Sequence, residues 1–195
     1  MKVAIVKYNA GNTASVVNAL ERIGVSASIS NDPDILHSAD KVIFPGVGEA
    51  SSAMAYLRER NLDSAVRSLR QPVLGICLGM QLLCASSEEN DTECIGIVPL
   101  RVRRFVDAAD LKVPHMGWNT VSDLSSPLFN GIDAKEYVYF VHGYFVEKGE
   151  TTTATCNYGT DFSAALQYEN FFAVQFHPEK SGIAGQRILE NFLKL

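Results

Sequence analysis

Cys77 lies in a pattern that is typical of an enzyme nucleophile. Gly75 and Gly79 flank it in the run GICLG, which directly follows the apolar stretch Val73–Ile76 and precedes a helix-like segment. This is the G-x-nucleophile-x-G elbow, with a cysteine where many hydrolases have a serine. The glycines are needed because the turn from strand to helix is too tight for side chains at these positions. A thiol at the start of a helix also faces the positive end of the helix dipole, which favours the thiolate.

A candidate base for such a thiol lies near the carboxyl end of the chain. His177 and Glu179 are two residues apart in the run QFHPE, which follows the last predicted strand. Side chains at i and i+2 point to the same side of an extended backbone, and Pro178 disfavours a helix at His177. Glu179 is therefore expected to orient His177, which would take the proton of Cys77, as in a nucleophile–base–orienter triad. Taken alone, Cys77 could instead be a buried residue in a tight turn, and His177 a structural histidine.

The remaining cysteines and His37 are weaker candidates. No two cysteines form a CxxC pair, and no Cys/His cluster has the spacing of a zinc site. The sequence therefore predicts no metal and no cofactor. His37 lies in a polar turn and is expected at the surface. Reduced, structural thiols are expected at Cys84, Cys94 and Cys156, with Cys84 on about the same helix face as Cys77.

The first half of the sequence alternates strand-like and helix-like segments. This alternation predicts an α/β fold with a mostly parallel open sheet and helices on both faces. Cys77 would then lie at the carboxyl ends of the strands, where the sites of such folds are found. The predicted strands are Lys2–Val6, Val25–Ile29, Lys41–Phe44 and Val73–Ile76. The predicted helices are Thr13–Ile23, Met54–Leu69 with a break near Asn61, and Leu78–Ala85.

The second half has closely spaced strand-like segments, which predict an antiparallel extension of the sheet. Glu169-Asn170 is a plausible two-residue hairpin turn between the last two of them. Ser86–Glu93, with the sequence SSEENDTE, is expected to be a solvated acidic loop without regular structure. The predicted strands are Gly117–Val121, Glu136–Val146, Thr151–Asn157, Ala164–Tyr168 and Phe171–Gln175, followed by a helix over Gly182–Leu195.

Length and charge exclude several classes of protein. The chain has 195 residues, and its 17 Lys+Arg against 22 Asp+Glu give a net charge of −5, whereas nucleic-acid surfaces are normally basic. No apolar run approaches the roughly 20 residues of a membrane span, and the N-terminus lacks the apolar core of a signal peptide. We therefore expect a cytoplasmic protein with one domain over residues 1–195, whose core needs no disulfide or metal.

The motifs together resemble those of a known family. GICLGMQLL around Cys77, QFHPEKSG around His177 and the run PGVG at residues 45–48 resemble the class I (triad) glutamine amidotransferases, and the match runs over nearly the whole chain. Two further runs, PHMGWN at residues 114–119 and FVHGY at residues 140–144, are similar to the glutamine amidotransferase subunits of imidazole glycerol phosphate synthase, of histidine biosynthesis. The resemblance implies a flavodoxin-like three-layer fold and a single amidotransferase domain.

The resemblance also implies a glutaminase. Cys77 would attack the side-chain amide of glutamine, His177 would take the thiol proton and protonate the departing ammonia, and Glu179 would orient His177. Water would then hydrolyse the thioester on Cys77 to release glutamate. The implied oxyanion donors are the backbone of Leu78 and the loop Gly46, Val47 and Gly48, whose glycines allow a peptide to flip. The implied glutamine-binding positions are Gln81, His142, Gly143 and Tyr144, although many relatives carry Ser where Gly143 stands.

A partner subunit follows from the same resemblance. Ammonia would pass to a (β/α)8-barrel cyclase subunit in a heterodimer. There it would join a phosphorylated ribulosyl-formimino carboxamide intermediate to give imidazole glycerol phosphate and an aminoimidazole carboxamide ribotide. Trp118, Asn119, Tyr137 and Lys180 match positions that the family uses at that interface. From residue type alone, Trp118 could equally be a core anchor, and Lys180 a solvated surface charge.

Two other functions stay open at this point. The same chemistry could serve another synthase, for example in anthranilate or pyridoxal phosphate synthesis, although those relatives should lack PHMGWN. Alternatively, Cys77 could be the reactive thiol of a non-catalytic binding or redox-sensing protein. Release of glutamate from glutamine would separate the enzymes from the binding protein, and the identity of a copurifying synthase would separate the two enzymes.

Overall fold

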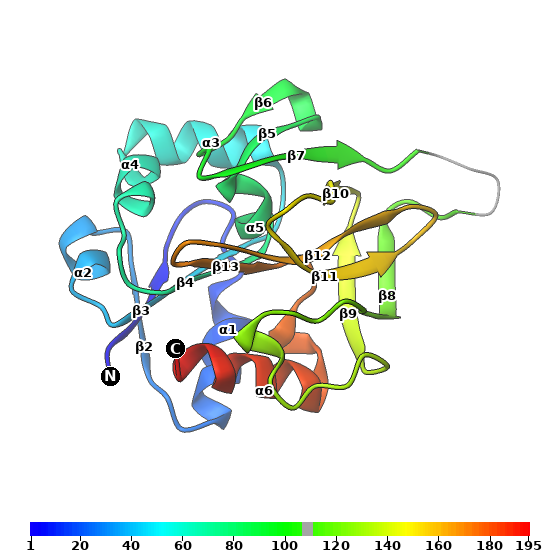
Figure 1. Ribbon diagram of the computed structural model, residues 1–195. Helices are drawn as coiled ribbons and strands as arrows, with labels where there is room; N and C mark the ends of the chain where they lie inside the picture. Colours follow the sequence, from blue (N-terminus) through cyan, green and yellow to red (C-terminus); the bar gives the residue numbers. More distant parts are fainter. Residues whose placement is uncertain (107–110) are drawn as a thin grey trace.

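The computed structural model describes residues 1–106 and 111–195, and a mixed β-sheet forms its middle layer (Figure 1). One half of this sheet is parallel, as predicted. Its strands, in spatial order, are β2 (Ala27–Ser30), β1 (Val3–Val6), β3 (Lys41–Gly46), β4 (Val73–Cys77) and β13 (Phe171–Val174). Every residue of β1, β3, β4 and β13 is buried, as expected for parallel strands that are covered on both faces.

The other half of the sheet is largely antiparallel, and this prediction is also confirmed. The hairpin turn at Glu169-Asn170 joins β13 to its antiparallel neighbour β12 (Asp161–Tyr168), and Glu169 has the positive φ of 51° that a tight turn requires. Beyond β12 follow β10 (Tyr144–Val146), β7 (Val98–Arg104), β5 (Cys84–Ser87) and β6 (Thr92–Glu93), and β11 (Thr152–Asn157) pairs with β12 as well.

A separate two-stranded ribbon stands beside this sheet. It consists of β8 (His115–Thr120) and β9 (Tyr137–His142), which are antiparallel. The prediction of one continuous strand over Glu136–Val146 is therefore wrong, because the chain changes its partner at Gly143. Residues before Gly143 pair with β8, and residues after it join the main sheet through β10.

Helices cover both faces of the sheet and give the fold three layers (Figure 1). On one face lie α2 (Pro33–His37), α3 (Ala50–Glu59), α4 (Leu62–Arg67) and α5 (Leu78–Leu83), and on the other α1 (Thr13–Arg22) and α6 (Gly182–Leu193). Alternate residues of β1 divide between the two cores, with Ala4 and Val6 in one and Val3 and Ile5 in the other. None of the helices in the described ranges is long and apolar enough to cross a bilayer.

The helical segment predicted over Met54–Leu69 is broken where expected. Asn61 has a left-handed backbone with φ 55° and separates α3 from α4. The helix that follows Cys77 is shorter than predicted. It ends at Leu83, because Cys84 is extended, with ψ 177°, and begins β5. Cys84 is buried, as predicted, but in a strand and not on a helix face.

The prediction of an unstructured loop over Ser86–Glu93 is wrong. The segment contains the end of β5, the 3₁₀ turn η1 (Glu89–Asp91) and β6. Glu88 accepts a hydrogen bond from Arg103 Nη1 at 2.9 Å, and Glu89 accepts one from the backbone N–H of Ala50 at 2.7 Å. The segment is ordered because its carboxylates have partners elsewhere in the fold, which a run of acidic residues does not reveal.

Candidate active site

Cys77 occupies the sharp turn between β4 and α5. Its backbone, with φ 53° and ψ −109°, is strained for a residue that has a side chain. The flanking glycines are required by close packing. A Cβ on Gly79 would lie 1.8 Å from the carbonyl oxygen of Phe44, and a Cβ on Gly75 would lie 3.0 Å from Leu83. The predicted elbow is therefore present, for the physical reason expected.

His177 reaches the same place from the end of β13, which pairs with β4 in parallel. Its Nδ1 lies 2.7 Å from Oε1 of Glu179, and both side chains are buried. The extended backbone expected between them is wrong. His177 itself is extended, but the 3₁₀ turn η3 (Pro178–Lys180) follows at once. A turn, and not alternation along a strand, brings the two side chains together.

The surroundings of His177 favour its protonated form. Burial lowers the pKa of His177, but the interaction with the Cys77 thiol and the hydrogen bond and charge of Glu179 outweigh it and raise the pKa to about 10. Within the described residues, Nε2 of His177 has no hydrogen-bond partner. The imidazole can therefore hold a proton beside the sulfur and deliver it to a leaving group.

Gln175 is a functional candidate that the sequence analysis missed. Its Nε2 lies 3.7 Å from Sγ of Cys77, and its Oε1 accepts a hydrogen bond from Nε2 of Gln81 at 3.0 Å. Gln81 also donates to the carbonyl of Tyr144 at 2.9 Å. Since both of these bonds use the amide nitrogen of Gln81, a ligand would meet its oxygen. The available signal was a polar residue directly after an apolar strand and two positions before His177.

A cavity of about 430 Å³ opens beside Cys77. Most of the residues predicted for the oxyanion and for glutamine binding form its wall, whereas Gly46, His177 and Glu179 are not among the lining residues. The lining residues are Val47, Gly48, Cys77, Leu78, Gln81, Glu89, Pro114, Val141, His142, Gly143 and Tyr144. The structure thus brings together segments from β3, the elbow, the acidic segment and the junction of β9 with β10.

Glu89 is a second residue that the sequence analysis missed, because it lies in the segment expected to be a solvated loop. It is one of the residues that line the cavity. Its carboxylate accepts the N–H of Ala50, yet partial burial outweighs this bond and raises the pKa of Glu89 above its usual value. A partly buried acidic residue in the cavity lining is suited to bind a positively charged part of a ligand.

The loop Gly46, Val47 and Gly48 has a backbone arrangement that bears on its predicted oxyanion role. The N–H of Val47 donates to the carbonyl of Ala10 at 2.6 Å, so it is not free to donate into the cavity. Gly48 has φ 108°, which strains any residue with a side chain. In the described arrangement, therefore, Val47 does not supply an oxyanion donor.

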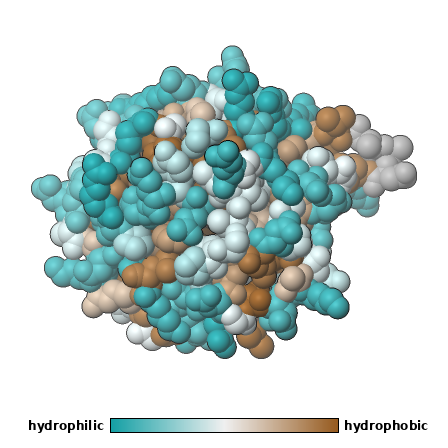
Figure 2. All heavy atoms as spheres, in the orientation of Figure 1, coloured by the Kyte–Doolittle hydropathy of each residue, from teal (hydrophilic) through white to brown (hydrophobic). Residues whose placement is uncertain are grey.

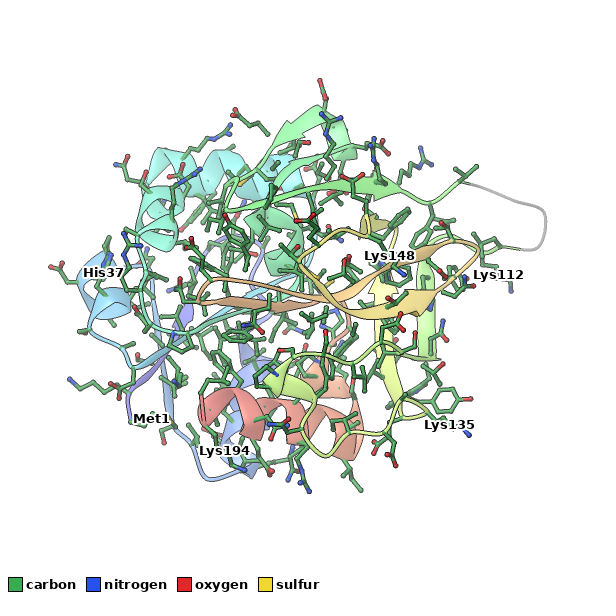
Figure 3. All side chains as sticks on the ribbon, in the orientation of Figure 1. Met1, His37, Lys112, Lys135, Lys148 and Lys194 are labelled. Atoms are coloured by element: carbon green, nitrogen blue, oxygen red, sulfur yellow. The ribbon has the colours of Figure 1, made fainter. Side chains whose placement is uncertain are left out.

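A chain of polar groups runs from β8 to the cavity. Nδ1 of His142 lies 2.7 Å from the carbonyl oxygen of Tyr144, so Nδ1 carries the proton of this ring. Nε2 of His142 accepts a hydrogen bond from Nδ1 of His115 at 3.2 Å. Nε2 of His115 then accepts from the amide of Asn119 at 3.4 Å. This pattern requires both rings to be neutral, which agrees with burial lowering the pKa of His115 to about 4 and that of His142 to about 3. His37 is remote from all these groups, on α2 (Figure 3).

The outward face of the β8–β9 ribbon exposes large apolar side chains. Figure 2 shows mostly hydrophilic residues on the face it draws, with apolar residues in small separate areas. On the ribbon, however, Met116, Trp118 and Tyr137 are 63, 54 and 60% exposed. Lys180 is exposed nearby, with Nζ 6.0 Å from the ring centre of Tyr139. Asn119 differs from the other predicted interface residues, because its amide points inward to His115 and to the carbonyl of Asn157.

No group of three or more His, Cys, Asp or Glu residues in the described ranges is placed to hold a metal ion. A thiol on a strained turn, an imidazole that retains a proton, a carboxylate that orients it and an adjoining cavity are the parts of a cysteine-based acyl-transfer site.

Comparison with known structures supports this fold. The chain resembles a glutamine amidotransferase at a TM-score of 0.75, with 20% identity over 100% of this chain and 98% of that one. It also resembles PurLQS from Thermotoga maritima at a TM-score of 0.71, with 19% identity over 99% of this chain and 97% of that one. At such identities the likeness concerns the fold alone.

Comparison of sequences is more specific. Residues 4–195 match the family described as glutamine amidotransferase class-I. The chain is 57% identical to imidazole glycerol phosphate synthase subunit HisH of Bacteroides fragilis (strain YCH46), over 100% of both chains. It is 47% identical to subunit HisH 1 of Vibrio vulnificus (strain YJ016), over 100% of this chain and 98% of that one. The chain therefore belongs to the class-I glutamine amidotransferase family and, within it, to the HisH subunits of imidazole glycerol phosphate synthase.

Proposed function

We propose that this protein is the glutaminase subunit of an imidazole glycerol phosphate synthase in histidine biosynthesis. It hydrolyses glutamine to glutamate and ammonia as one amidotransferase domain, and a cyclase subunit consumes the ammonia. The observation that carries the chemistry is the convergence of Cys77 and the His177–Glu179 pair, bonded at 2.7 Å, beside a cavity. The relatives that carry the HisH name support the biosynthetic role.

Cys77 is the nucleophile in this proposal. Its sulfur attacks the side-chain amide carbon of glutamine, and the carbonyl oxygen takes on negative charge near the backbone N–H of Leu78. His177 holds the proton and gives it to the amide nitrogen, which leaves as ammonia. Water then attacks the thioester, His177 takes a proton from it, and glutamate leaves with the thiol restored. Glu179 keeps His177 oriented and stabilises its charge throughout.

The cavity wall suggests how glutamine is held. Glu89 would face the positively charged amino group of the substrate, since it is an acidic residue of the cavity lining. The oxygen of Gln81 is available to a donor, because its nitrogen is bonded to Gln175 and Tyr144. The backbone at His142, Gly143 and Tyr144 would contact the other polar groups of glutamine.

A (β/α)8-barrel cyclase subunit would dock on the β8–β9 ribbon. Trp118, Tyr137 and Met116 form an exposed apolar surface there, and aromatic residues are favoured at interfaces. Lys180 adds a positive charge, while Asn119 would act through the ribbon and not by direct contact. The ribbon adjoins the nucleophile, since Sγ of Cys77 lies 3.8 Å from the carbonyl of Val141 on β9. Ammonia would therefore have a short path to the partner.

All four cysteines are free thiols, as expected for a cytoplasmic complex.

The test uses the complex of this protein with the cyclase subunit. Cys77→Ala should abolish glutamate release from glutamine but leave synthesis of imidazole glycerol phosphate from added ammonium salt intact. Cys94→Ala removes another buried thiol and should retain both activities. Full glutaminase activity in Cys77→Ala would sink the proposal. Copurification with a different synthase would favour the same chemistry in another pathway, and no glutamate release by the unmodified complex would favour a reactive-thiol binding protein.

A further inference from the structure

Tyr8 is a buried tyrosine beside the site that has no part in the chemistry above. It lies just after β1, with its ring 5.3 Å from that of Phe44. A Cβ on Gly46 would lie 2.1 Å from the Tyr8 hydroxyl oxygen, so the hydroxyl packs against the α-carbon of Gly46, which begins the Gly46–Val47 peptide. Gly46 in turn is the register partner of Cys77.

The hydroxyl of Tyr8 is unpartnered in the arrangement described. Tyr8 is 7% exposed, and in residues 1–106 and 111–195 its oxygen has no hydrogen-bond partner. A buried hydroxyl without a partner is unfavourable, and phenylalanine would fill the same space without that penalty. Burial and, less strongly, Cys77 raise the pKa of Tyr8 above its usual value, so the group keeps its proton and can donate. Packing alone thus does not account for a tyrosine here.

The N–H of Val47, in the neighbouring Gly46–Val47 peptide, has a hydrogen-bond partner, whereas the Tyr8 hydroxyl has none in the described residues. The N–H of Val47 is bonded to the carbonyl of Ala10 at 2.6 Å, although it lies on the loop that borders the cavity. To reach an oxyanion on glutamine, it would have to leave Ala10 through rotation of the Gly46–Val47 peptide. That rotation changes ψ of Gly46, which a glycine tolerates, together with φ of Val47. That rotation would turn the carbonyl of Gly46 towards the carbonyl of Ala10, where two acceptors would repel each other.

We propose that Tyr8 is a positioning residue for the oxyanion loop, whose hydroxyl donates to the carbonyl oxygen of Gly46 once the Gly46–Val47 peptide has rotated. Tyr8 and Ala10 belong to the same segment, which runs along this side of the loop. The hydroxyl would satisfy the rotated carbonyl and so hold the N–H of Val47 towards the substrate. The inference rests on the proposed glutaminase function, and it concerns how that site completes its oxyanion hole.

The experiment compares Tyr8→Phe with the unmodified protein, each in complex with the cyclase subunit and its ligand. We expect kcat for glutamate release to fall about three- to ten-fold, the effect of one hydrogen bond that forms on the way to the transition state. KM for glutamine should not change. The melting temperature should stay the same or rise, because the lost hydroxyl has no partner in the arrangement described.

Alkylation of Cys77 by iodoacetamide supplies the discriminating control, since that reaction forms no oxyanion. Its rate should be equal in both proteins. Tyr168→Phe is the matched variant, because Tyr168 is half-buried against the same core but lies near the opposite end of β4 and should leave kcat unchanged.

Three results would overturn the role of Tyr8. Two are an unchanged kcat in Tyr8→Phe and a rise in KM without a fall in kcat. The third is a fall in the alkylation rate that parallels the fall in kcat, because the hydroxyl would then act on the reactivity of the Cys77 thiol and not on the oxyanion loop. Failure of the unmodified complex to release glutamate would instead refute the proposed function, and the role of Tyr8 with it.

Discussion

The side chain of Gln175 connects the substrate cavity to the nucleophile: its Oε1 accepts from Gln81 at 3.0 Å, and its Nε2 lies 3.7 Å from Sγ of Cys77. Gln175 is fully buried, so water cannot replace either of these two contacts of its amide group. A neutral donor fixed beside the sulfur stabilises negative charge there without competing for the proton of His177.

Gln175→Leu is expected to lower both stability and thiol reactivity. It would leave an N–H of Gln81 unpaired in a buried place, which should reduce the free energy of unfolding by about 1–3 kcal/mol. It would also remove the donor at Cys77, so alkylation by iodoacetamide at pH 7 should slow. Urea unfolding and alkylation kinetics measure the two effects. The double variant Gln81→Leu/Gln175→Leu should be less destabilised than the sum of the single variants, and strict additivity would contradict the coupling.

Glu179→Gln is expected to reduce catalysis and to shift its pH dependence. The amide keeps a hydrogen bond but loses the charge that stabilises protonated His177, so kcat should fall by about 10²-fold or more. Glu179 is one of the groups that raise the pKa of His177. Without its charge that pKa is lower, and the protonated form is lost sooner as pH rises. The alkaline limb of the kcat profile should therefore move to lower pH.

Glu190→Gln is the matched control for this change, because Glu190 lies on α6 and pairs with Gln186 and Arg187 at the surface. It should leave both kcat and the pH profile as they are. An alkaline limb that stays in place in Glu179→Gln would mean that Glu179 does not act through the charge of His177.

The positions of Cys77 and His177, which we propose as nucleophile and base, could be predicted from the sequence because their constraints are local. Gly75 and Gly79 mark the elbow within two residues of Cys77, and Glu179 lies two residues from His177. The parallel half of the sheet could be predicted for the same reason, since each strand and helix has its own periodicity. The detailed path between His177 and Glu179 could not, because a 3₁₀ turn and an extended segment both suit a spacing of two.

The residues that the sequence analysis missed have distant partners. Gln175 and Gln81 are 94 positions apart, Ala50 and Glu89 are 39 apart, and His115 and His142 are 27 apart. Only the folded chain brings such groups together, and a polar side chain on its own predicts a solvated residue. The same reason explains why Ser86–Glu93 is ordered, although its composition is typical of a loop.

The buried pair of His115 and His142 should make the protein sensitive to acid. The pKa of His115 is lowered to about 4 and that of His142 to about 3, against 6.5 for an ordinary histidine. Above pH 6.5 both rings are neutral in the folded and unfolded chain, so their contribution is fully present. As pH falls below 6.5, the two histidines become protonated in the unfolded chain but stay neutral in the folded protein. The free energy of unfolding therefore decreases until the pH reaches the pKa values of the folded protein.

Between pH 6.5 and pH 5 this loss should be about 2 kcal/mol for each histidine. Urea unfolding at pH 7, 6 and 5 measures it. His142→Asn removes one of the two titrating groups, so its stability should decrease less steeply with acid than that of the unmodified protein. His37→Asn is the control, because His37 is exposed on α2 and should leave the slope unchanged. Equal slopes in all three proteins would contradict burial of the neutral pair.

Two glycines near the site should respond oppositely to substitution. Gly79→Ala would place a methyl group 1.8 Å from the carbonyl oxygen of Phe44, so the elbow must shift, and we expect loss of soluble folded protein or of most activity. At Gly143 a Cβ would meet only Val113, at an ordinary 3.8 Å. Gly143→Ser should therefore fold normally, with the hydroxyl at the cavity wall and KM for glutamine unchanged or lower. A marked loss of stability in Gly143→Ser would show that the junction of β9 and β10 requires glycine.

Trp118→Ala should weaken binding of the cyclase subunit without changing the structure of the site. The indole is 54% exposed on the outward face of β8, so its loss leaves no cavity in the core. If it anchors the partner, the dissociation constant should rise at least about 30-fold, the effect of an interface residue worth roughly 2 kcal/mol. Titration calorimetry with the purified cyclase measures this. Basal glutaminase activity without the partner should be unaffected, because Cys77, His177 and Glu179 keep their places.

Ile35→Ala is the control. It removes an exposed apolar side chain from α2, at the far edge of the fold (Figure 1), and this variant should bind the cyclase subunit normally. If Trp118→Ala also binds normally, the partner must dock elsewhere, and the apolar face of the ribbon would need another occupant.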